Sequence, residues 1–564
     1  MNAAYWLNTA WMWKCRRELG AFQCAAASVA ESQAARLGEI LAPNRATEFG
    51  RAHDFSSIDT VKSFQRRVPL ANYDSFRDAI ERIGAGAPAV LSAQPVRLLQ
   101  PTSGSMGGEK LIPYNAALRG EFQRGIAAWL GVLLRAYPAV RRGRAYWSIS
   151  PALGVGRKTS GGIPIGFDDD SAYLGGLERF ALDKLLAAPA DLARMADVNN
   201  FRYCTLLHLL AAKDLALVSI WSPTFLTTLL DRLDAWGERI VRDLRDGSLT
   251  PPNPLGDSVN VLNSMRTQRQ RALELDGILS SRLTLAEKLK KIWPQLALIS
   301  CWADGNSARY IPALRELFPD VEFQPKGLLA TEAFVSFPLV GRAGAALALR
   351  SHFFEFIEQD GARIRLAHQL GLGVRYEVVV TTGGGLYRYR LGDIVEVVGY
   401  ENHCPLLRFI GRAGKVSDLV GEKLHEAHVQ KVVDEAFAAY GLTPRFAMMA
   451  PVDNERRGYC LYLQGLDRAL SRQLLDALAD TIESGLASNP YYGQAVRLGQ
   501  LSKLQIELLA PDGATGWSVY ERECLARGQK LGDIKPALLH DWPGWHERLT
   551  PLAIDRNSLG SQRL

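Results

Sequence analysis

Gln100-Pro-Thr-Ser-Gly-Ser-Met-Gly-Gly-Glu-Lys-Leu-Ile-Pro113 is the stretch around which this chain is organised, since it gathers hydroxyl side chains, three glycines and a lysine in one place. Before it, the apolar run Val96 to Leu99 predicts a buried strand. After it, Asn115 can cap an amphipathic helix over residues 116–136 that ends before Pro138. A strand, a glycine-rich loop and a helix in this order favour a phosphate-binding cradle.

The side chains of this loop suit an anion. Gly104 and its neighbouring glycines let backbone N–H groups close around a phosphate. Thr102, Ser103 and Ser105 add hydroxyl donors, and Lys110 adds a positive charge. A flexible surface turn has a similar composition, so the loop alone leaves both interpretations open.

The composition predicts a large globular protein that handles small anionic molecules. With 564 residues, 47% of them hydrophobic, the chain can bury a large core and should divide into more than one domain. The net charge of +7 arises from 66 basic and 59 acidic residues spread along the whole length. Nucleic-acid binding calls for a concentrated basic patch, so we expect no nucleic-acid partner.

Cysteine usage and hydropathy predict a cytoplasmic protein without a membrane span. The cysteines are odd in number, scattered and without a Cys-x-x-Cys or Cys/His cluster, which indicates reduced thiols. The apolar start of the chain has its positive charges after it, the reverse of a signal peptide. The run Tyr203 to Trp221 contains His208, Lys213 and Asp214, and therefore predicts a buried helix followed by a strand.

Two further clusters carry polar side chains between strand-like segments. Thr331 and Glu332 lie between two such segments, where a hydroxyl could bond a phosphate and a carboxylate could hold Mg²⁺. A second strand after the turn at residues 383–385 is interrupted at Gly392-Asp393. Such an aspartate can accept both hydrogen bonds of a ribose diol, although a turn aspartate that bonds its own backbone is the simpler interpretation.

A domain boundary is predicted in the glycine-containing segment 409–426. It follows the last strand of one region and precedes a helix over residues 426–440. Beyond it, strands and helices alternate and predict a small α/β domain that ends in a glycine-rich tail, 528–536. The expected elements are strands 445–450, 459–464 and 503–509 and helices 469–486 and 517–527.

Three motifs in this order make the sequence similar to adenylate-forming enzymes, and more closely to the auxin-responsive Gretchen Hagen family of acyl-acid amido synthetases. Thr102-Ser-Gly-Ser-Met-Gly-Gly-Glu-Lys110 resembles the phosphate loop of the family, Ala330-Thr-Glu332 its second motif and Tyr389-Arg-Leu-Gly-Asp393 its third. The resemblance covers essentially the whole chain. Shorter matches are Thr47-Glu-Phe-Gly50, Val68-Pro-Leu70, Gly411-Arg412, Gly421-Glu-Lys423, Asn489-Pro-Tyr-Tyr492 and the tail from Gln529 to Pro536.

The resemblance implies an α/β fold with a large N-terminal adenylation domain, in which sheets are flanked by helices, and a small mobile C-terminal α/β domain. The corresponding boundaries are residues 1–412, which would also bind the acyl acid, and 413–564. It implies an ATP- and Mg²⁺-dependent ligase that adenylates a carboxylic acid and transfers the acyl group to an amino acid. Indole-3-acetate-like, jasmonate-like and benzoate-like acids all remain open, with pocket walls expected after Lys110 and within residues 200–300.

The resemblance also implies the role of each site residue. Thr102, Ser103, Gly104, Ser105 and Lys110 would hold the β- and γ-phosphates. Thr331 would bond the α-phosphate, Glu332 would hold Mg²⁺, and Asp393 would take the ribose diol with Arg412 nearby. Lys423 would reach a phosphate. Lys535 would be the mobile lysine that meets the reacting carboxylate and phosphate, a task suited to a compact charge on a flexible stem.

The chain departs from the family pattern at three places. Met106 stands where the phosphate loop usually has another hydroxyl, Ala330 replaces a small hydroxyl residue, and no arginine follows Pro536. Each of these changes affects one expected contact and leaves the rest of its motif in place.

Three other functions fit part of the pattern. An acyl-CoA synthetase shares the adenylation step and differs in the second nucleophile. A Walker-type phosphoryl-transfer enzyme fits less well, because Lys110 follows Glu109 and precedes Leu111 instead of completing Gly-Lys-Ser/Thr. A non-catalytic nucleotide-binding protein would keep the fold alone.

Overall fold

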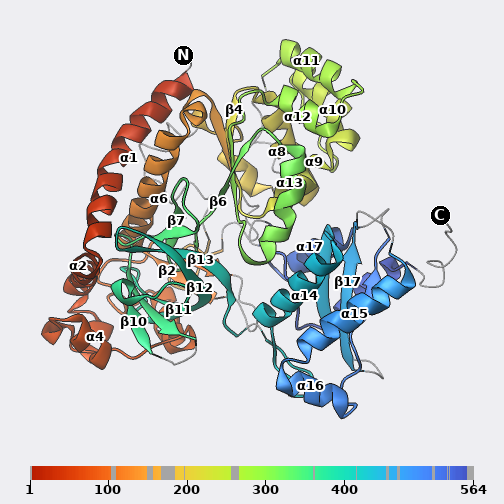
Figure 1. Cartoon of the computed structure of the whole chain (residues 1–564). Coiled ribbons are helices and arrows are strands. Elements are labelled where there is room, and N and C mark those ends of the chain that lie inside the picture. The colour runs from red at the N-terminus through yellow and green to blue at the C-terminus, as the bar shows by residue number, and fades with distance from the viewer. Residues whose placement is uncertain are drawn as a thin grey trace. The chain divides into compact units, whose positions relative to one another are not determined.

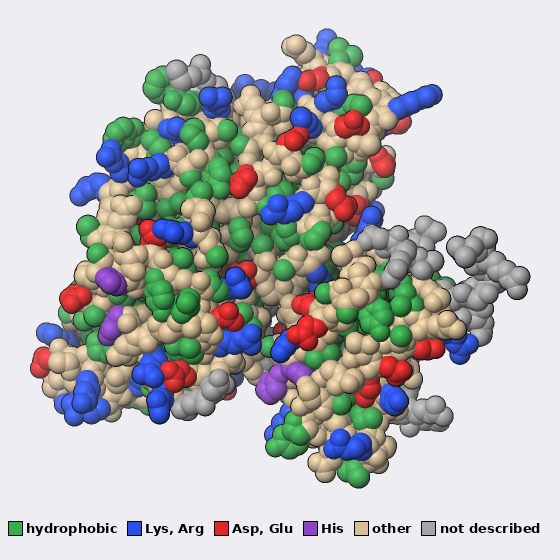
Figure 2. Space-filling view, in the orientation of Figure 1, with side chains coloured by type: hydrophobic (Ala, Val, Ile, Leu, Met, Phe, Trp, Pro, Cys, Tyr) green, Lys and Arg blue, Asp and Glu red, His purple; other side chains and the backbone are tan. Residues whose placement is uncertain are grey.

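The computed structural model describes residues 3–102, 110–148, 157–166, 184–195, 197–255, 266–359, 363–414, 416–452, 457–466, 470–510, 515–529, 531 and 534–554. The chain forms two compact units. The first contains residues 1–304 and 314–409, and the second contains residues 305–313 and 410–564. Figure 2 shows Lys and Arg side chains dispersed over the visible face of each unit and interleaved with acidic ones, in keeping with the small, spread-out excess of positive charge.

Helices form the N-terminal part of the first unit. Two long ones, α1 and α6, run alongside each other (Figure 1) and enclose part of one continuous hydrophobic core. Asn115 caps α6, as predicted, by accepting a hydrogen bond from the N–H of Leu118 at 2.9 Å. The helices are α1 (Ala3–Ala27), α2 (Val29–Leu41), α3 (Glu48–Ala52), α4 (Val61–Arg67), α5 (Arg77–Gly84) and α6 (Ala116–Ala136).

A strand that the sequence did not indicate separates the glycine-rich loop from α6. β1 (Leu98–Thr102) and β2 (Lys110–Tyr114) pair antiparallel, with Thr102 opposite Lys110. The expected order of strand, loop and helix is therefore wrong: the loop connects two strands, and the N-terminus of α6 lies one strand beyond it. An anion in the loop would be bound without the helix terminus that the sequence suggested.

The middle of the first unit is a parallel sheet in the order β3-β4-β5-β6. Its strands are β3 (Arg144–Trp147), β4 (Leu215–Ser219), β5 (Leu298–Cys301) and β6 (Glu322–Pro325). The helices between them are α8 (Val198–Ala211), α9 (Pro223–Leu230), α10 (Leu233–Asp246), α11 (Arg269–Leu279), α12 (Leu285–Ile292) and α13 (Ile311–Leu317). The expected buried helix and strand within residues 203–221 correspond to α8 and β4.

A second sheet follows in the order β10-β9-β11-β12-β13-β8-β7. Its strands are β7 (Ser336–Pro338), β8 (Ala345–Leu347), β9 (Phe353–Glu358), β10 (Ile364–Leu366), β11 (Arg375–Thr381), β12 (Tyr389–Glu401) and β13 (Cys404–Arg412). The register between β11 and β12 shifts around Gly392, whose φ is +76°. The strand interruption predicted there from Gly392-Asp393 is confirmed.

The second unit is a small α/β body with its own hydrophobic core. Its strands are β14 (Val416–Ser417), β15 (Leu424–His425), β16 (Phe446–Val452), β17 (Gly458–Gln464) and β18 (Gln505–Leu508). Its helices are α14 (Glu426–Tyr440), α15 (Arg472–Leu486), α16 (Pro490–Arg497), α17 (Gly516–Ala526) and α18 (Trp545–Leu549). β17 pairs antiparallel with β16 and parallel with β18. The alternation of strands and helices expected from the sequence is confirmed.

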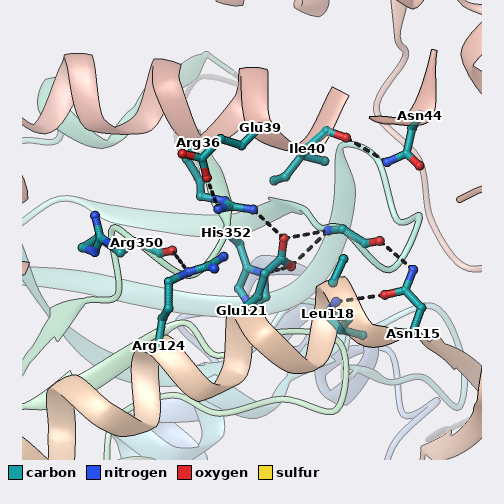
Figure 3. A network of polar contacts seen from close by, with 12 residues as sticks. Arg36, Glu39, Ile40, Asn44, Asn115, Leu118, Glu121, Arg124, Arg350 and His352 are labelled. Atoms are coloured by element: carbon teal, nitrogen blue, oxygen red, sulfur yellow. Dashed lines mark hydrogen bonds and ion pairs between the residues drawn. The ribbon is translucent and has the colours of Figure 1, made fainter. Parts of the chain in front are cut away.

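The fully buried carboxylate of Glu121, on α6, ties the parts of the first unit together (Figure 3). Both of its oxygens accept a hydrogen bond from the N–H of Gly383 at 3.0 Å. Nη2 of Arg36, on α2, lies 3.0 Å from one oxygen, and Nδ1 of His352 lies 2.8 Å from the other. A Cβ at Gly383 would come within 2.8 Å of the carboxylate, so this close approach requires glycine.

The hydrogen bonds of His352 define its tautomer. Its Nε2 accepts from the N–H of Phe334 at 3.0 Å, so Nδ1 carries the proton and donates to Glu121. Burial lowers the pKa of His352, which keeps the imidazole neutral at pH 7. The carbonyl of Gly383 in turn accepts from Nδ2 of Asn115 at 2.8 Å. The start of α6, the turn after β11 and the segment before β7 are thus held by one network.

Replacing Glu121 by alanine should destabilise the first unit by about 3–5 kcal/mol, because it leaves Arg36 and the Gly383 N–H buried without their shared acceptor. Guanidinium unfolding followed by tryptophan fluorescence measures the change. Glu39→Ala is the matched control, since Glu39 pairs with the same Arg36 from an exposed position and should cost at most about 1 kcal/mol. Equal effects of the two substitutions would contradict the role given to the buried carboxylate.

Candidate functional site

The structure places the predicted site residues in both units. In the first unit lie Thr102, Lys110, Thr331, Glu332 and Asp393, and in the second lie Arg412, Lys423 and Lys535. Ser103, Gly104 and Ser105 fall outside the described residues.

Lys110 begins β2 at the edge of the glycine-rich loop. Its amine lies 5.7 Å from the centre of the Tyr73 ring, and the hydroxyl of Tyr73 accepts from the N–H of Leu111 at 2.8 Å. Tyr73 thus fixes the backbone next to Lys110 and provides an aromatic face for its charge. On the other strand, Thr102 is the register partner of Lys110, so both ends of the loop are held by the hairpin.

β2 also connects the loop to Thr331 and Glu332. The hydroxyl of Tyr114, at the far end of β2, donates to the carbonyl of Thr331. Four residue steps of strand separate Tyr114 from Lys110, a distance of about 14 Å. Glu332 is 7% exposed, and two residues later the N–H of Phe334 is the donor that His352 binds. The second motif is therefore attached both to the hairpin and to the Glu121 network.

Asp393 lies at the irregularity between β11 and β12 and is 3% exposed. The start of β12 is fixed by Arg388, whose φ of +48° is unusual for a side chain with a Cβ. The guanidinium of Arg388 donates to both carboxylate oxygens of Glu355, at 2.9 and 3.0 Å, and to the carbonyl of Val68 at 2.7 Å. The Val68-Pro-Leu70 match to the family is thus part of the support for the strand that carries Asp393.

Glu332 is the carboxylate of the first unit that the family resemblance assigns to a metal. Among the residues that the structure describes, no group of three or more His, Cys, Asp or Glu side chains could hold a metal ion by itself. Mg²⁺ is usually held by one or two carboxylates together with substrate phosphates and water. A single buried carboxylate such as Glu332 fits that mode of binding.

In the second unit, Lys423 lies in a hydrogen-bonded turn between β14 and β15. Its φ is +45°, and its side chain is exposed. The buried carboxylate of Glu422 accepts from the N–H groups of Leu419 and Val420, both at 2.8 Å, and from the hydroxyl of Tyr459. Nδ2 of Asn489 donates to the carbonyls of Glu422 and Lys423, at 3.1 and 3.3 Å. Two short matches to the family, 421–423 and 489–492, therefore meet in space.

Lys535 has a fixed backbone and an exposed side chain. Its carbonyl accepts from the hydroxyl of Tyr520 at 3.0 Å. Shortly after it, Leu538 and His540 form backbone hydrogen bonds to Met449 of β16, at 2.6 and 2.9 Å. Lys535 thus reaches outward from an anchored segment. Arg412 ends β13 and is also exposed.

Sequence reasoning missed the residues that support these motifs. Glu121 lies on the buried side of α6 beside Leu118, Phe122 and Gly125, and its place among those positions is the one signal in the sequence. His352 gives no comparable signal, since its partners Glu121 and Phe334 lie far away along the chain. Arg388 lies just outside the third motif, and its partners Glu355 and Val68 are distant in the sequence.

Two general expectations concern redox state and membranes. All seven cysteines lie in described residues and none forms a disulfide, as expected of reduced thiols. No helix in the described part of the chain is long and apolar enough to cross a membrane.

Comparison with known proteins gives matches over most of the chain. The GH3 family N-terminal domain matches residues 18–323, more than half of the chain, and the GH3 family central domain matches residues 345–412. The indole-3-acetic acid-amido synthetase GH3.2 of Arabidopsis thaliana is 26% identical over 470 residues, which cover 78% of this chain and 85% of that protein. The indole-3-acetic acid-amido synthetase GH3.8 of Oryza sativa subsp. indica is 24% identical over 507 residues, 84% of this chain and 83% of that protein.

The fold has a counterpart among solved structures. The AtGH3.15 acyl acid amido synthetase in complex with 2,4-DB superposes with a TM-score of 0.84 at 21% sequence identity, and the match covers 96% of both chains. The mixed α/β fold expected from the sequence is therefore confirmed.

Asn489→Ala should destabilise the second unit by about 1–3 kcal/mol, because it removes a helix cap together with two hydrogen bonds to the Glu422-Lys423 turn. Thermal unfolding measures the loss, and trypsin should cut after Lys423 more readily in the variant. Ser471→Ala, which removes only the cap of α15, is the control and should leave that cleavage unchanged. Faster cleavage in both variants would show that Asn489 does not hold the turn.

Proposed function

The chain belongs to the GH3 family, which its motifs resemble, and we propose that it is an AMP-forming acyl acid amido synthetase, a carbon–nitrogen ligase. Membership of the family implies the use of ATP, with an acyl acid and an amino acid as the other substrates. The observation that carries the proposal is the family match over residues 18–323 and 345–412, which includes the first motif, 102–110, and the third, 389–393. The second motif, 330–332, lies between the two matched ranges.

The reaction has two steps. In the first, a carboxylate oxygen of the acid attacks the α-phosphorus of ATP, an acyl-adenylate forms and pyrophosphate leaves. In the second, the amine of the amino acid attacks the acyl carbon, an amide forms and AMP leaves. Neither step needs covalent participation by the protein, so its contribution is positioning and charge stabilisation.

The first unit supplies the binding groups for ATP in this proposal. Thr102, Lys110 and the loop between them hold the β- and γ-phosphates, and Thr331 bonds the α-phosphate. Asp393 accepts from the ribose hydroxyls; its burial in a bulged strand gives a carboxylate that needs little reorganisation on binding.

Mg²⁺ is the metal that we propose for Glu332. When bound, it would neutralise charge that gathers on the phosphate oxygens during the first step. Glu332 is suited to hold it, since its backbone is fixed by the neighbouring contacts of Thr331 and Phe334.

The second unit supplies cations. Lys535 meets the reacting carboxylate and the α-phosphate, Lys423 reaches a phosphate, and Arg412 lies near the ribose. The anchored backbones and exposed side chains of Lys423 and Lys535 support these roles. We assign residues 1–412 to adenylation and acid binding and residues 413–564 to a mobile lid. Arg412, the last residue of the first range, falls in the second compact unit and begins the proposed hinge, which extends to Gly421.

The location and the acid belong to the proposal as well. The seven free cysteines favour the cytoplasm. Indole-3-acetate-like, jasmonate-like and benzoate-like acids are all candidates, and indole-3-acetic acid is named for the plant relatives GH3.2 and GH3.8.

A screen of carboxylic acids against amino acids tests the proposal. Pyrophosphate release should depend on both ATP and an acid, and mass spectrometry should find an acyl–amino acid amide when amino acids and coenzyme A are supplied together. A thioester product would identify an acyl-CoA synthetase instead. No pyrophosphate release with any acid would leave a non-catalytic nucleotide-binding protein.

Glu332→Gln should raise the Mg²⁺ concentration needed for half-maximal pyrophosphate release by about tenfold or more, because it removes the charged ligand. A titration of Mg²⁺ at saturating ATP measures this, and a chelator should abolish release from the unaltered protein. Glu322→Gln, an exposed position on β6, is the control. An unchanged Mg²⁺ requirement in the Glu332 variant would remove this residue from the metal site.

Lys535→Ala should slow acid-dependent pyrophosphate release by about a hundredfold or more while ATP affinity stays within a factor of about two, since the lysine acts mainly on the developing charge. Stopped-flow pyrophosphate release and a direct measurement of ATP binding separate the two effects. Lys503→Ala, also exposed in the second unit, should change neither. An unchanged rate of pyrophosphate release in the Lys535 variant would contradict the proposed role of Lys535 in adenylate formation.

A further inference from the structure

A row of four side chains crosses the carboxyl edge of the parallel sheet. Trp147 of β3 is the register partner of Ser219 on β4. Ser219 is in turn paired with Ser300 on β5, and Ser300 is paired with Gln324 on β6. Register partners on neighbouring strands project from the same face of a sheet. In open parallel sheets, this edge is where ligands bind.

Lys326, two residues beyond Gln324, brings a positive charge to the row. Its amine donates to Oγ of Ser219 at 2.7 Å and lies 4.9 Å from the Trp129 ring centre and 5.1 Å from that of Trp221. Burial lowers the pKa of Lys326 to about 8, so at pH 7 the group is still mainly an ammonium ion. Among the described residues, no carboxylate lies within ion-pair distance of it.

The cluster has more hydrogen-bond donors than acceptors. An ammonium group has three N–H donors, and Lys326 uses one of them on Ser219. Oε1 of Gln324 accepts from Nε1 of Trp129 at 3.0 Å, while its Nε2 is buried without a partner in the described part of the chain. A buried donor without an acceptor costs free energy. The cluster therefore calls for a ligand with an acceptor or anionic oxygen.

The surrounding rings indicate the shape of that ligand. The rings of Trp129 and Trp147 lie 5.9 Å apart, and those of Trp221 and Trp302 lie 5.5 Å apart. Indole faces on both sides of an ammonium favour a flat aromatic partner. The five residue steps from Lys326 to Thr331 span at most about 18 Å, so the cluster lies within reach of the second motif.

We propose that Lys326, Gln324 and the flanking tryptophans bind the ring end of the acyl substrate, and that this substrate is an aromatic carboxylic acid with a second oxygen on its ring. The inference rests on the proposed function, in which Lys535 takes the reacting carboxylate. Lys326 and Gln324 then donate hydrogen bonds to the oxygen of the ring substituent, which is a phenolic hydroxyl or a second carboxylate.

Only part of this cluster lies in the regions that the sequence predicted as pocket walls. Trp129, Ser219 and Trp221 fall in the two regions where the sequence predicted pocket walls, after Lys110 and within residues 200–300. Gln324 and Lys326 lie outside both. The chemistry that selects the substrate thus comes from the end of β6.

Calorimetric titration of the full chain without ATP tests the inference with three probes: benzoate, 4-hydroxybenzoate and benzene-1,4-dicarboxylate. At least one of the two oxygen-substituted acids should bind about tenfold tighter than benzoate, as expected of a hydrogen bond to a charged donor. Lys326→Met should remove this preference and leave benzoate affinity within a factor of about two. Lys290→Met, an exposed lysine paired with Asp320, should keep the preference.

The outcomes separate the inference from the proposed function. An equal loss for all three acids in Lys326→Met would mean that Lys326 holds the reacting carboxylate, and would overturn the assignment. So would the absence of any preference in the unaltered protein, or a preference that survives both Lys326→Met and Gln324→Met. Selective binding without pyrophosphate release would instead contradict the proposed function and leave the cluster as an acid-binding site.

Discussion

The arrangement of the first unit depends on one buried charge, the carboxylate of Glu121. A buried carboxylate without partners would cost several kcal/mol, so α6 can pack in its place only if Arg36, His352 and the N–H of Gly383 come to meet it. His352 binds the backbone of Phe334, two residues after the second motif, and Gly383 lies in the turn before β12, which carries the third motif. Satisfying one charge therefore brings together α2, the turn before β12 and, through His352, the segment before β7. Figure 3 shows Arg36 and His352 around Glu121.

The hydrogen-bond network around Glu121 helps to position the three motifs of the first unit. Asn115 holds the turn before β12 and stands directly after β2, which begins at Lys110 and ends at the tyrosine bound to Thr331. His352 fixes the backbone two residues after Glu332. The strand after the Gly383 turn carries Asp393. In the second unit, anchored turns present Lys423 and Lys535. We propose that the first unit binds ATP and the acid and that the second unit supplies mobile cations.

Local signals in the sequence were sufficient for much of the fold. The bounds of α6 were predicted from its cap and its amphipathic pattern, and the predicted helix over residues 426–440 has the bounds of α14. The irregularity at Gly392-Asp393 was predicted from a glycine in a strand. Contacts between residues far apart in the sequence could not be predicted in this way. β2 contains Pro113 and is a strand only because it pairs with β1. The place of Glu121 on the apolar side of α6 indicates burial, but its partners Arg36, His352 and Gly383 are far away along the chain. The order of the motifs pointed to the family, but no motif contains Gln324 or Lys326.

The central claim, activation of a carboxylic acid as its adenylate, can be tested by following one oxygen atom. An acid labelled with heavy oxygen in its carboxylate is incubated with the full chain, ATP, Mg²⁺ and an amino acid, and the AMP is analysed by mass spectrometry. Attack of the carboxylate on the α-phosphorus predicts AMP that carries one labelled oxygen from the acid. Unlabelled AMP, or label in inorganic phosphate, would contradict the account.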